Sequence, residues 1–403
     1  MNINFRIKNF RAIQSQEVKL APLTVLYGAN GAGKSTLLYA LLTLKNIILN
    51  PNQRTSNFFN YGFVNLGNYE AIVFDHKSKE KVSLEVRMDY EELTTSYSVT
   101  FDEREVVFAL SLMDSTDILG KFQIETSFPY SLLESQRGSI PFRLADFYVS
   151  WNGITAEISS PTRELSEQAM VLANAMNAPI ELLRTTQVVP LKRGFSKPQF
   201  STVSLSPTLI TEDELATFLS AKRYLVPQLS RYLEQIVGHD LRVNYQPGTS
   251  IFSLDSTDRE TGLATELVNE GFGVNQIVHF LAICLNEDSR IVCVEEPEIH
   301  LHPTAVRKLA RVLVEISRKQ NKIFVISTHS EAFLFALLTM VADQKLKPGD
   351  LACYYAHKKG HVGEFEPQGV NDRGQVEGGL TSFLEGELED FRTMFQITDL
   401  PPN

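Results

Sequence analysis

The sequence of 403 residues has little cysteine, no long apolar run and no excess of basic residues. Its three cysteines, Cys284, Cys293 and Cys353, lie in apolar runs, which indicates buried thiols in a reducing compartment rather than a disulfide framework. No run of about 18 apolar residues is present, and the first residues alternate like a strand rather than a signal peptide. We therefore expect a cytoplasmic protein without membrane contact.

The charge balance excludes a protein that is basic over its whole surface. The sequence has 38 Lys and Arg residues against 48 Asp and Glu residues, a formal net charge of −10. Hydrophobic residues make up 43% of the chain, which is enough for a large core. The length fits two lobes, or one large domain with an insertion. No sustained heptad pattern is present, so we expect no long coiled coil.

What the sequence does contain is a phosphate-binding pattern near its N-terminus. Residues 28–35, GANGAGKS, match the pattern G-x-x-x-x-G-K-[ST]. A short apolar run, residues 23–27, precedes the pattern, and a glycine-free apolar run, residues 35–49, follows it. This order predicts a buried strand, a loop and a helix, which is the context that such a phosphate-binding loop (P-loop) requires.

A P-loop binds the phosphates of a nucleotide through its main-chain N–H groups and the positive end of the following helix. Lys34 is expected to reach the β- and γ-phosphates, and Ser35 to ligate Mg²⁺. We therefore predict ATP and Mg²⁺ as cofactors. The predicted nucleotide-binding residues of the loop are Asn30, Gly31, Ala32, Gly33, Lys34, Ser35 and Thr36.

Polar residues also end two later apolar strands. Residues 291–294 predict a buried strand that leads into Glu295 and Glu296. We assign Glu295 to Mg²⁺ and Glu296 as the general base that deprotonates the attacking water. Further along the chain, a second apolar strand leads into His329, and ligands bind at the carboxyl ends of such strands. His329 is therefore the candidate sensor of the γ-phosphate, and Lys34, Glu296 and His329 form the predicted catalytic set.

Changes of pattern divide the chain into three parts. Residues 1–112 hold the P-loop and the alternating strands of an antiparallel meander. Residues 113–245 indicate a mainly helical insertion, in which Pro227 is expected to kink or end a helix. Residues 246–403 return to alternating strands and helices, which predicts a mostly parallel sheet.

Five segments, in this order, carry a resemblance to a known family: KNFRAI, GANGAGKS, NEGFGVNQ, VCVEEPEIHLHP and VISTHS. Together they resemble the ABC-type ATPases of the SMC and RecF kind, and above all the stand-alone relatives of the OLD (overcoming lysogenization defect) ATPases. The resemblance implies an α/β fold: a P-loop NTPase of ABC/SMC-head type with an antiparallel β subdomain and a mainly helical insertion. It also implies that Arg11 lies near the phosphates or base, and that residues 298–302 touch the opposite subunit.

The family further implies a signature motif that caps the nucleotide bound by the other subunit. The candidate is NEGFGVNQ, residues 269–276, with Gly271 just ahead of a predicted helix. The segment contains no serine, so Asn269 or Asn275 must replace its hydroxyl, and the sequence leaves the choice open. An ordinary glycine-rich helix entry is the alternative. Asn68 is the candidate substitute for the glutamine of the family's glutamine loop.

These implications favour an enzyme, an ATP-hydrolysing switch in which two subunits of a homodimer enclose two ATP molecules. The resemblance suggests a role in DNA metabolism or antiviral defence, with a separate effector protein. The alternative is a non-hydrolysing, ATP-bound sensor or scaffold module, because the signature is degenerate. The residues after His329 hold no convincing acidic metal set, so we expect no Toprim nuclease site of the kind that OLD nucleases carry.

DNA is left open as a partner. The basic residues between residues 113 and 245 are few and scattered, and a solvated surface is the simpler interpretation of them. The residues considered for DNA binding are Lys192, Arg193, Lys197, Lys222 and Arg223.

Overall fold

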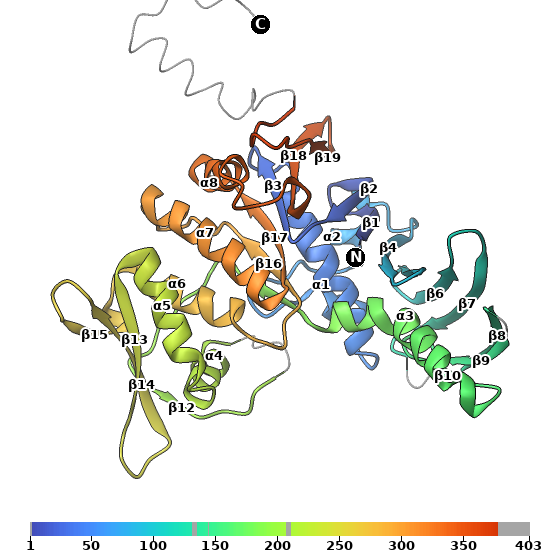
Figure 1. The fold of residues 1–403 in the computed structure, drawn as a ribbon, viewed down its shortest axis with the longest axis horizontal. Helices are drawn as coiled ribbons and strands as arrows, with labels where there is room; N and C mark the ends of the chain where they lie inside the picture. Colours follow the sequence, from blue (N-terminus) through green and yellow to red (C-terminus); the bar gives the residue numbers. More distant parts are fainter. Residues whose placement is uncertain (1, 131–134, 144, 207–210, 378–403) are drawn as a thin grey trace, which may run out of the picture.

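The computed structural model describes residues 2–130, 135–143, 145–206 and 211–377. At its centre is a six-stranded sheet with the order β11-β16-β17-β3-β18-β19 (Figure 1). All neighbours in this sheet run parallel except β18 and β19, which form an antiparallel hairpin. The carboxyl ends of β3, β16 and β17 therefore lie at one edge of the sheet. The strands are β3 (Leu23–Gly28), β11 (Thr186–Val189), β16 (Ile291–Glu295), β17 (Ile323–Thr328), β18 (Leu351–Lys359) and β19 (Val362–Gln368).

A second, antiparallel sheet has the order β2-β1-β4-β5-β6-β7 and contains the predicted meander. A small sheet, β10-β9-β8, lies beyond its last strand (Figure 1). Side chains alternate between the core and the other face along these strands, as the sequence predicted. The strands are β1 (Ile3–Phe10), β2 (Ile13–Leu20), β4 (Val82–Tyr90), β5 (Leu93–Phe101), β6 (Glu105–Met113), β7 (Ile118–Ser127), β8 (Gln136–Phe142), β9 (Ala145–Trp151) and β10 (Ala156–Ser159).

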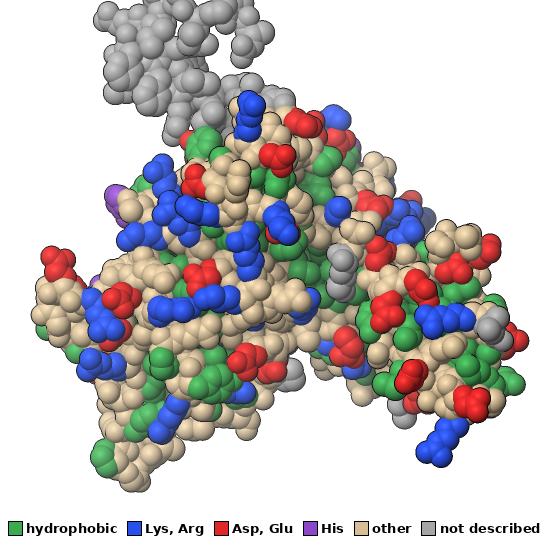
Figure 2. Space-filling model, viewed as in Figure 1, with side chains coloured by type: hydrophobic (Ala, Val, Ile, Leu, Met, Phe, Trp, Pro, Cys, Tyr) green, Lys and Arg blue, Asp and Glu red, His purple; other side chains and the backbone are tan. Residues whose placement is uncertain are grey.

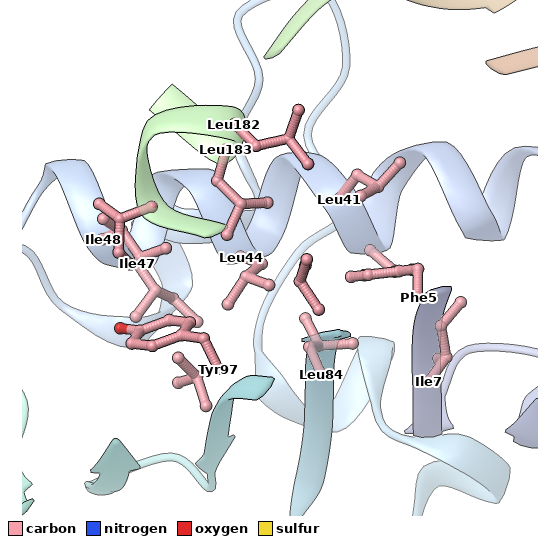
Figure 3. Packing of buried hydrophobic residues seen from close by; sticks show 14 of the residues in the cluster. Phe5, Ile7, Leu41, Leu44, Ile47, Ile48, Leu84, Tyr97, Leu182 and Leu183 are labelled. Carbon is pink, nitrogen blue, oxygen red and sulfur yellow. The ribbon is translucent and has the colours of Figure 1, made fainter. Parts of the chain in front are cut away.

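Helix α1 (Lys34–Leu49) is buried between the two large sheets, because nearly every side chain along it contributes to the core. Figure 3 shows Leu41 and Leu44 of α1 facing Phe5 and Leu84 of the antiparallel sheet. Helix α3 (Ser166–Arg184) packs across α1 through Leu183 in the same cluster. The helix that follows the P-loop is thus held by apolar contacts on several sides.

The other face of the central sheet is covered by α6 (Phe272–Cys284), α7 (Pro303–Gln320) and α8 (Glu331–Ala342). A further lobe, at the lower left of Figure 1, continues this cluster. It comprises α4 (Glu212–Ala221), α5 (Leu225–Val237), β12 (Phe200–Ser201), β13 (His239–Tyr245), β14 (Ile251–Asp258) and β15 (Ala264–Glu266). The short helices are α2 (Tyr69–Ile72) and the 3₁₀ turns Thr55–Phe59, Phe74–His76, Arg163–Leu165, Leu267–Asn269 and Pro348–Asp350.

Residues 113–245 differ from the mainly helical insertion expected from the sequence. They contain strands β8 to β10 as well as helices, and β11 joins the central sheet. The period-two pattern Phe147, Val149, Trp151, all buried, is the signal that was missed. Pro227 lies in the first turn of α5, where no main-chain N–H is needed, and the break between α4 and α5 precedes it. The three-part division stays a prediction, and residues 378–403 of its last part lie outside the described residues.

The surface and the cysteines agree with the composition. All three cysteines are buried and free. No helix in the described part of the chain is long and apolar enough to cross a membrane. Figure 2 shows Lys and Arg side chains interspersed with Asp and Glu side chains over one face, with several basic side chains around α7. No single sign of charge covers that face.

Candidate functional site

The P-loop lies between β3 and α1, as predicted. Helix α1 begins directly after Gly33, whose φ of 93° is in the left-handed region that glycine adopts without strain. A β-carbon on Gly28 would collide with the carbonyl oxygen of Ala356 in β18, so this position also needs glycine. Asn30 and Gly31 are exposed at the tip of the loop. Ala32 and Thr36 are buried, and Lys34 and Ser35 open the helix.

The three predicted catalytic residues meet at the carboxyl edge of the sheet. The Nζ atom of Lys34 lies 2.9 Å from Nε2 of His329. The same Nε2 atom lies 2.9 Å from Oε1 of Glu296. Lys34 also donates to the carbonyl oxygens of Gly28 and Ala29, at 2.9 Å and 3.1 Å. Segments almost 300 residues apart along the chain thus bring one ammonium, one imidazole and one carboxylate into direct contact.

Glu296 leaves the strand through an unusual backbone conformation. Its φ is 42°, in the left-handed region that non-glycine residues seldom adopt, and its N–H donates to the carbonyl oxygen of Ser327 at 2.9 Å. Such strain is held by surrounding contacts and is common at functional sites. The turn breaks the alternation of β16, so that the Glu296 carboxylate can approach His329.

Burial is the main cause that raises the pKa of Glu296 well above its usual range, and the neighbouring Glu298 carboxylate adds to the rise. Burial also lowers the pKa of Lys34, and burial together with the charge of Lys34 lowers the pKa of His329. His329 is therefore neutral at pH 7, so that one ring nitrogen can donate a hydrogen bond and the other can accept one. A carboxylate with a raised pKa is suited to take up a proton near neutral pH.

Glu298, expected only in a loop that touches another subunit, lies inside this site. Its Oε1 atom accepts hydrogen bonds from the Thr328 hydroxyl at 2.7 Å and from the His329 N–H at 2.8 Å. Two residues on, His300 packs its ring on Phe272 at the start of α6, with centroids 5.6 Å apart. The His302 ring accepts from the Thr304 N–H and caps α7, which is a structural role. The loop therefore ties the paired glutamates to the candidate signature within one chain.

The residues predicted to hold Mg²⁺ lie on the α1 side of the sheet. Glu295 is 5% exposed, and both of its carboxylate oxygens accept from the Tyr39 hydroxyl, at 2.9 and 3.0 Å. Ser35 lies one helical turn before Tyr39, on the same side of α1. Glu295 is paired in register with Ser327, whose Oγ atom is buried without a hydrogen-bond partner.

The Glu295 carboxylate, the Ser35 and Tyr39 hydroxyls and the unpartnered Ser327 hydroxyl form an oxygen-rich set. Such a set fits a hard cation that keeps several waters. No group of three or more His, Cys, Asp or Glu side chains that could hold a metal occurs within the described residues. The predicted Mg²⁺ site therefore depends on oxygens from Ser35 and Glu295, together with those of the nucleotide.

Arg11 lies beside this oxygen-rich set. Its guanidinium is 5.1 Å from the centre of the Tyr39 ring, and its Nη1 atom is buried without a hydrogen-bond partner. Its φ of 52° and the hydrogen bond from its N–H to the carbonyl oxygen of Ile72 turn the chain between β1 and β2. A guanidinium nitrogen without a hydrogen-bond partner can donate to a phosphate oxygen, and the position of Arg11 near the nucleotide stays a prediction.

The candidate signature residues differ in accessibility. Asn275 is buried: its amide donates to the carbonyl oxygens of Phe195 and Leu267 and accepts from the Phe195 N–H. Asn269 is exposed, and Gly271 at the start of α6 has open space around it. Of the two asparagines, only Asn269 is therefore available to a second molecule. Asn68, the candidate substitute in the glutamine loop, is exposed and caps helix α2.

Arg193, considered above as a surface contact for DNA, is buried in the site region. Its guanidinium donates to the carbonyl oxygens of Pro190, Glu295 and Glu296 at 3.1, 2.9 and 2.8 Å. It also lies over the ring of Phe280 in α6. Lys197 is tied to Asp213 at 2.6 Å. The structure thus removes Arg193 from any surface and makes it a support of the paired glutamates.

The raised pKa of Glu296 leads to a prediction for the pH dependence of hydrolysis. If Glu296 is the base, kcat/KM for ATP should rise with pH, by about tenfold per unit below the raised pKa of about 8, because only the carboxylate can accept a proton. Steady-state hydrolysis between pH 6 and 9.5 measures this. In the Glu298→Gln protein the neighbouring charge is gone, so the rise should move to lower pH. A flat profile, or one that stays in place in this variant, contradicts the assignment.

Comparison with known proteins identifies the family of the chain. The family model described as "AAA domain, putative AbiEii toxin, Type IV TA system" matches residues 23–335. A curated OLD nuclease from Thermus scotoductus (strain ATCC 700910 / SA-01) is 23% identical over 347 residues. The alignment covers 81% of this chain, which spans only 58% of the length of that relative.

Solved SMC heads are also similar. The SMC head domain from Thermotoga maritima is 11% identical with a TM-score of 0.42, over 91% of this chain and 99% of that one. The Smc head domain with an extended coiled coil, bound to the C-terminal domain of ScpA derived from Pyrococcus furiosus, is 10% identical with a TM-score of 0.47, over 97% and 98%.

The family match takes in the P-loop, the paired glutamates and His329, which are the residues that meet at the sheet edge. The similarity to an OLD nuclease agrees with the resemblance that the motifs suggested. The chain belongs to this AAA-domain family of nucleotide-binding ATPases.

Proposed function

We propose that the protein binds ATP with Mg²⁺ at the P-loop and hydrolyses it, and that nucleotide state switches a homodimer between closed and open forms. The observation that carries the proposal is the direct contact of Lys34, His329 and Glu296, each 2.9 Å from the next. A cation for phosphate, a neutral imidazole and a carboxylate of raised pKa are groups suited to phosphoryl transfer to water.

Each residue has a role that its surroundings support. Lys34 exchanges the carbonyl oxygens of Gly28 and Ala29 for phosphate oxygens, which are stronger acceptors because they are charged. Glu296 accepts the proton of the attacking water, and His329 donates a hydrogen bond where negative charge develops. Ser35 and Glu295 hold Mg²⁺, which when bound neutralises phosphate charge. Arg11 adds a guanidinium whose Nη1 atom is buried without a hydrogen-bond partner.

The dimer part of the proposal is supported by the exposed signature. Gly271 and the N-terminus of α6 are open to solvent, and Phe272 beside them is 73% exposed. A symmetric pair would bring each α6 terminus to the other subunit's phosphates, where its positive end stabilises them. We propose, on the resemblance alone, a role in DNA metabolism or antiviral defence with a separate effector protein. A cytoplasmic location agrees with the buried free cysteines.

The decisive test is nucleotide binding and turnover by wild type and Lys34→Ala. Wild type should bind ATP in the presence of Mg²⁺ and release phosphate, and the variant should weaken binding about 100-fold, because it removes a charged contact to two phosphates. Lys347→Ala, which changes an exposed lysine ahead of β18, is the matched control. Native mass measurement with and without ATP and Mg²⁺ reports the dimer. Equal binding by the Lys34→Ala and control proteins would refute the proposal.

A second candidate function has its own support. Asn275 is fully engaged with the main chain of Phe195 and Leu267, and residues 269–276 contain no serine. A signature with a single accessible asparagine fits a non-hydrolysing, ATP-bound sensor or scaffold. Phosphate release by wild type no faster than by Lys34→Ala, together with tight ATP binding, would favour this function.

A further inference from the structure

We propose that Lys358, on the hairpin of β18 and β19, is a further cation of the nucleotide site and binds the phosphate chain of ATP. The inference rests on the ATP binding proposed above. It adds a residue that belongs neither to the P-loop nor to the set of Glu295, Glu296 and His329. The Nζ atom of Lys358 lies 3.7 Å from the point that a β-carbon on Gly31 would occupy. The ammonium therefore lies against the tip of the P-loop.

Strand geometry gives an independent reason for this placement. Strand β18 runs parallel to β3, and their pairing ends with Ala356 opposite Gly28. Lys358 is two residues further, beyond the carboxyl edge of the sheet, where ligands of such sheets bind. Tyr354 and Ala356 belong to the core cluster on the α1 side. Because side chains alternate along a strand, Lys358 shares that side and Lys359 faces the opposite one.

The hairpin is fixed against the P-loop by its main chain. The N–H of Gly363 donates to the carbonyl oxygen of Ala12 at 2.7 Å. A β-carbon on Gly363 would lie only 3.0 Å from the carbonyl oxygen of Ala32, so glycine permits this close approach. The Gln16 side chain accepts from the Phe365 N–H at 3.2 Å and donates to its carbonyl oxygen at 3.1 Å. The main chain that carries Lys358 is thus preorganised, which lowers the entropic cost of binding.

The two adjacent lysines differ in their partners. Lys359 pairs with Glu364 at 2.7 Å on the same hairpin. For Lys358 the described part of the chain provides no ion pair. An ammonium without an acidic partner, placed against a loop built to bind anions, is a point charge suited to a phosphate oxygen. The ligand is therefore a nucleoside polyphosphate, and Lys358 contacts its phosphates and not its nucleobase.

The test is calorimetric titration of the full chain with ATP in the presence of Mg²⁺. Lys358→Ala should raise the Kd for ATP about tenfold, because one charge-assisted contact is lost. Lys359→Ala, the matched control on the opposite side of the strand, should stay within about twofold of wild type. Lys358→Arg keeps the charge and should stay close to wild type. Both lysines are exposed, so these changes leave the core intact.

The outcomes separate this inference from the function on which it rests. A Kd for Lys358→Ala that equals the Kd for Lys359→Ala overturns the inference, whatever the Lys34→Ala protein does. A Lys34→Ala protein that binds as tightly as wild type overturns the proposed P-loop binding. Titration with AMP adds a specific readout, because the difference between Lys358→Ala and wild type should shrink when the phosphate chain is shortened. An equal difference with ATP and AMP contradicts recognition of the phosphate chain.

Discussion

Replacing Glu296 by Gln should lower kcat for ATP hydrolysis at least about 100-fold while ATP still binds. Gln keeps an oxygen that can accept the hydrogen bond from the His329 N–H, so the loop geometry should survive. It has no carboxylate to accept the proton of the attacking water. Above the raised pKa of Glu296, the change to Gln also removes a negative charge from the site and so favours phosphate binding. Single-turnover release of phosphate and calorimetric titration measure the two effects separately.

The same variant should accumulate as the ATP-bound dimer, because closure then has no hydrolysis step to reverse it. Native mass measurement should find the dimer in the presence of ATP and Mg²⁺ and the monomer without them. Glu260→Gln, an equivalent change in an exposed turn, should hydrolyse ATP like wild type. Hydrolysis by Glu296→Gln at the wild-type rate would remove Glu296 from the mechanism. A variant that binds ATP but stays monomeric would contradict the dimer switch without contradicting the proposed hydrolysis.

The contiguous parts of the site were predictable from the sequence because each lies at the end of an apolar strand. The P-loop, the paired glutamates and His329 need no knowledge of the tertiary fold to be recognised. Parallel strands bring their carboxyl ends to one edge, so the meeting of Lys34, Glu296 and His329 could be expected.

The supporting residues were not predictable, because their roles depend on contacts across the fold. Tyr39 stands in an apolar helix and resembles any core aromatic, yet it meets Glu295, a residue 256 positions away. Arg193 follows Lys192 in a polar connector, so its charge suggested an exposed surface. Only the folded chain shows that it lies over Phe280 and below the paired glutamates. Lys358 is similarly ordinary until the pairing of β18 with β3 is known.

The helical expectation for residues 113–245 failed for a related reason. Strands β8 to β10 are only four to seven residues long, and polar residues alternate with their apolar ones. Such short runs carry little periodic signal, and sheet pairing, which is non-local, decides their structure. The long helix α3, by contrast, agrees with the helical expectation, and its apolar residues recur over several turns.

Replacing Arg193 by Met should lower the free energy of unfolding by about 3 kcal/mol, because three buried main-chain carbonyl oxygens lose their donor. The side chain is only 8% exposed, and burial lowers its pKa to about 10, so the guanidinium stays charged at neutral pH. Urea unfolding measures the loss. Lys192→Met, at the exposed neighbouring position, should change stability by less than about 0.5 kcal/mol.

Arg193 should also matter for turnover, and a second variant separates this role from stability. Its guanidinium donates to the main chain of Glu295 and Glu296. The next two residues of the connector, Gly194 and Phe195, donate their N–H groups to side chains of α6, which are His279 and Asn275. An ammonium cannot span three carbonyl oxygens as the planar guanidinium does, so Arg193→Lys should fold but lower kcat about tenfold, with KM for ATP little changed. If Arg193→Lys hydrolyses ATP at the wild-type rate, the arginine only stabilises the fold. A fall in kcat alone would mean that Arg193 holds the main chain of Glu295 and Glu296 in the position that turnover needs.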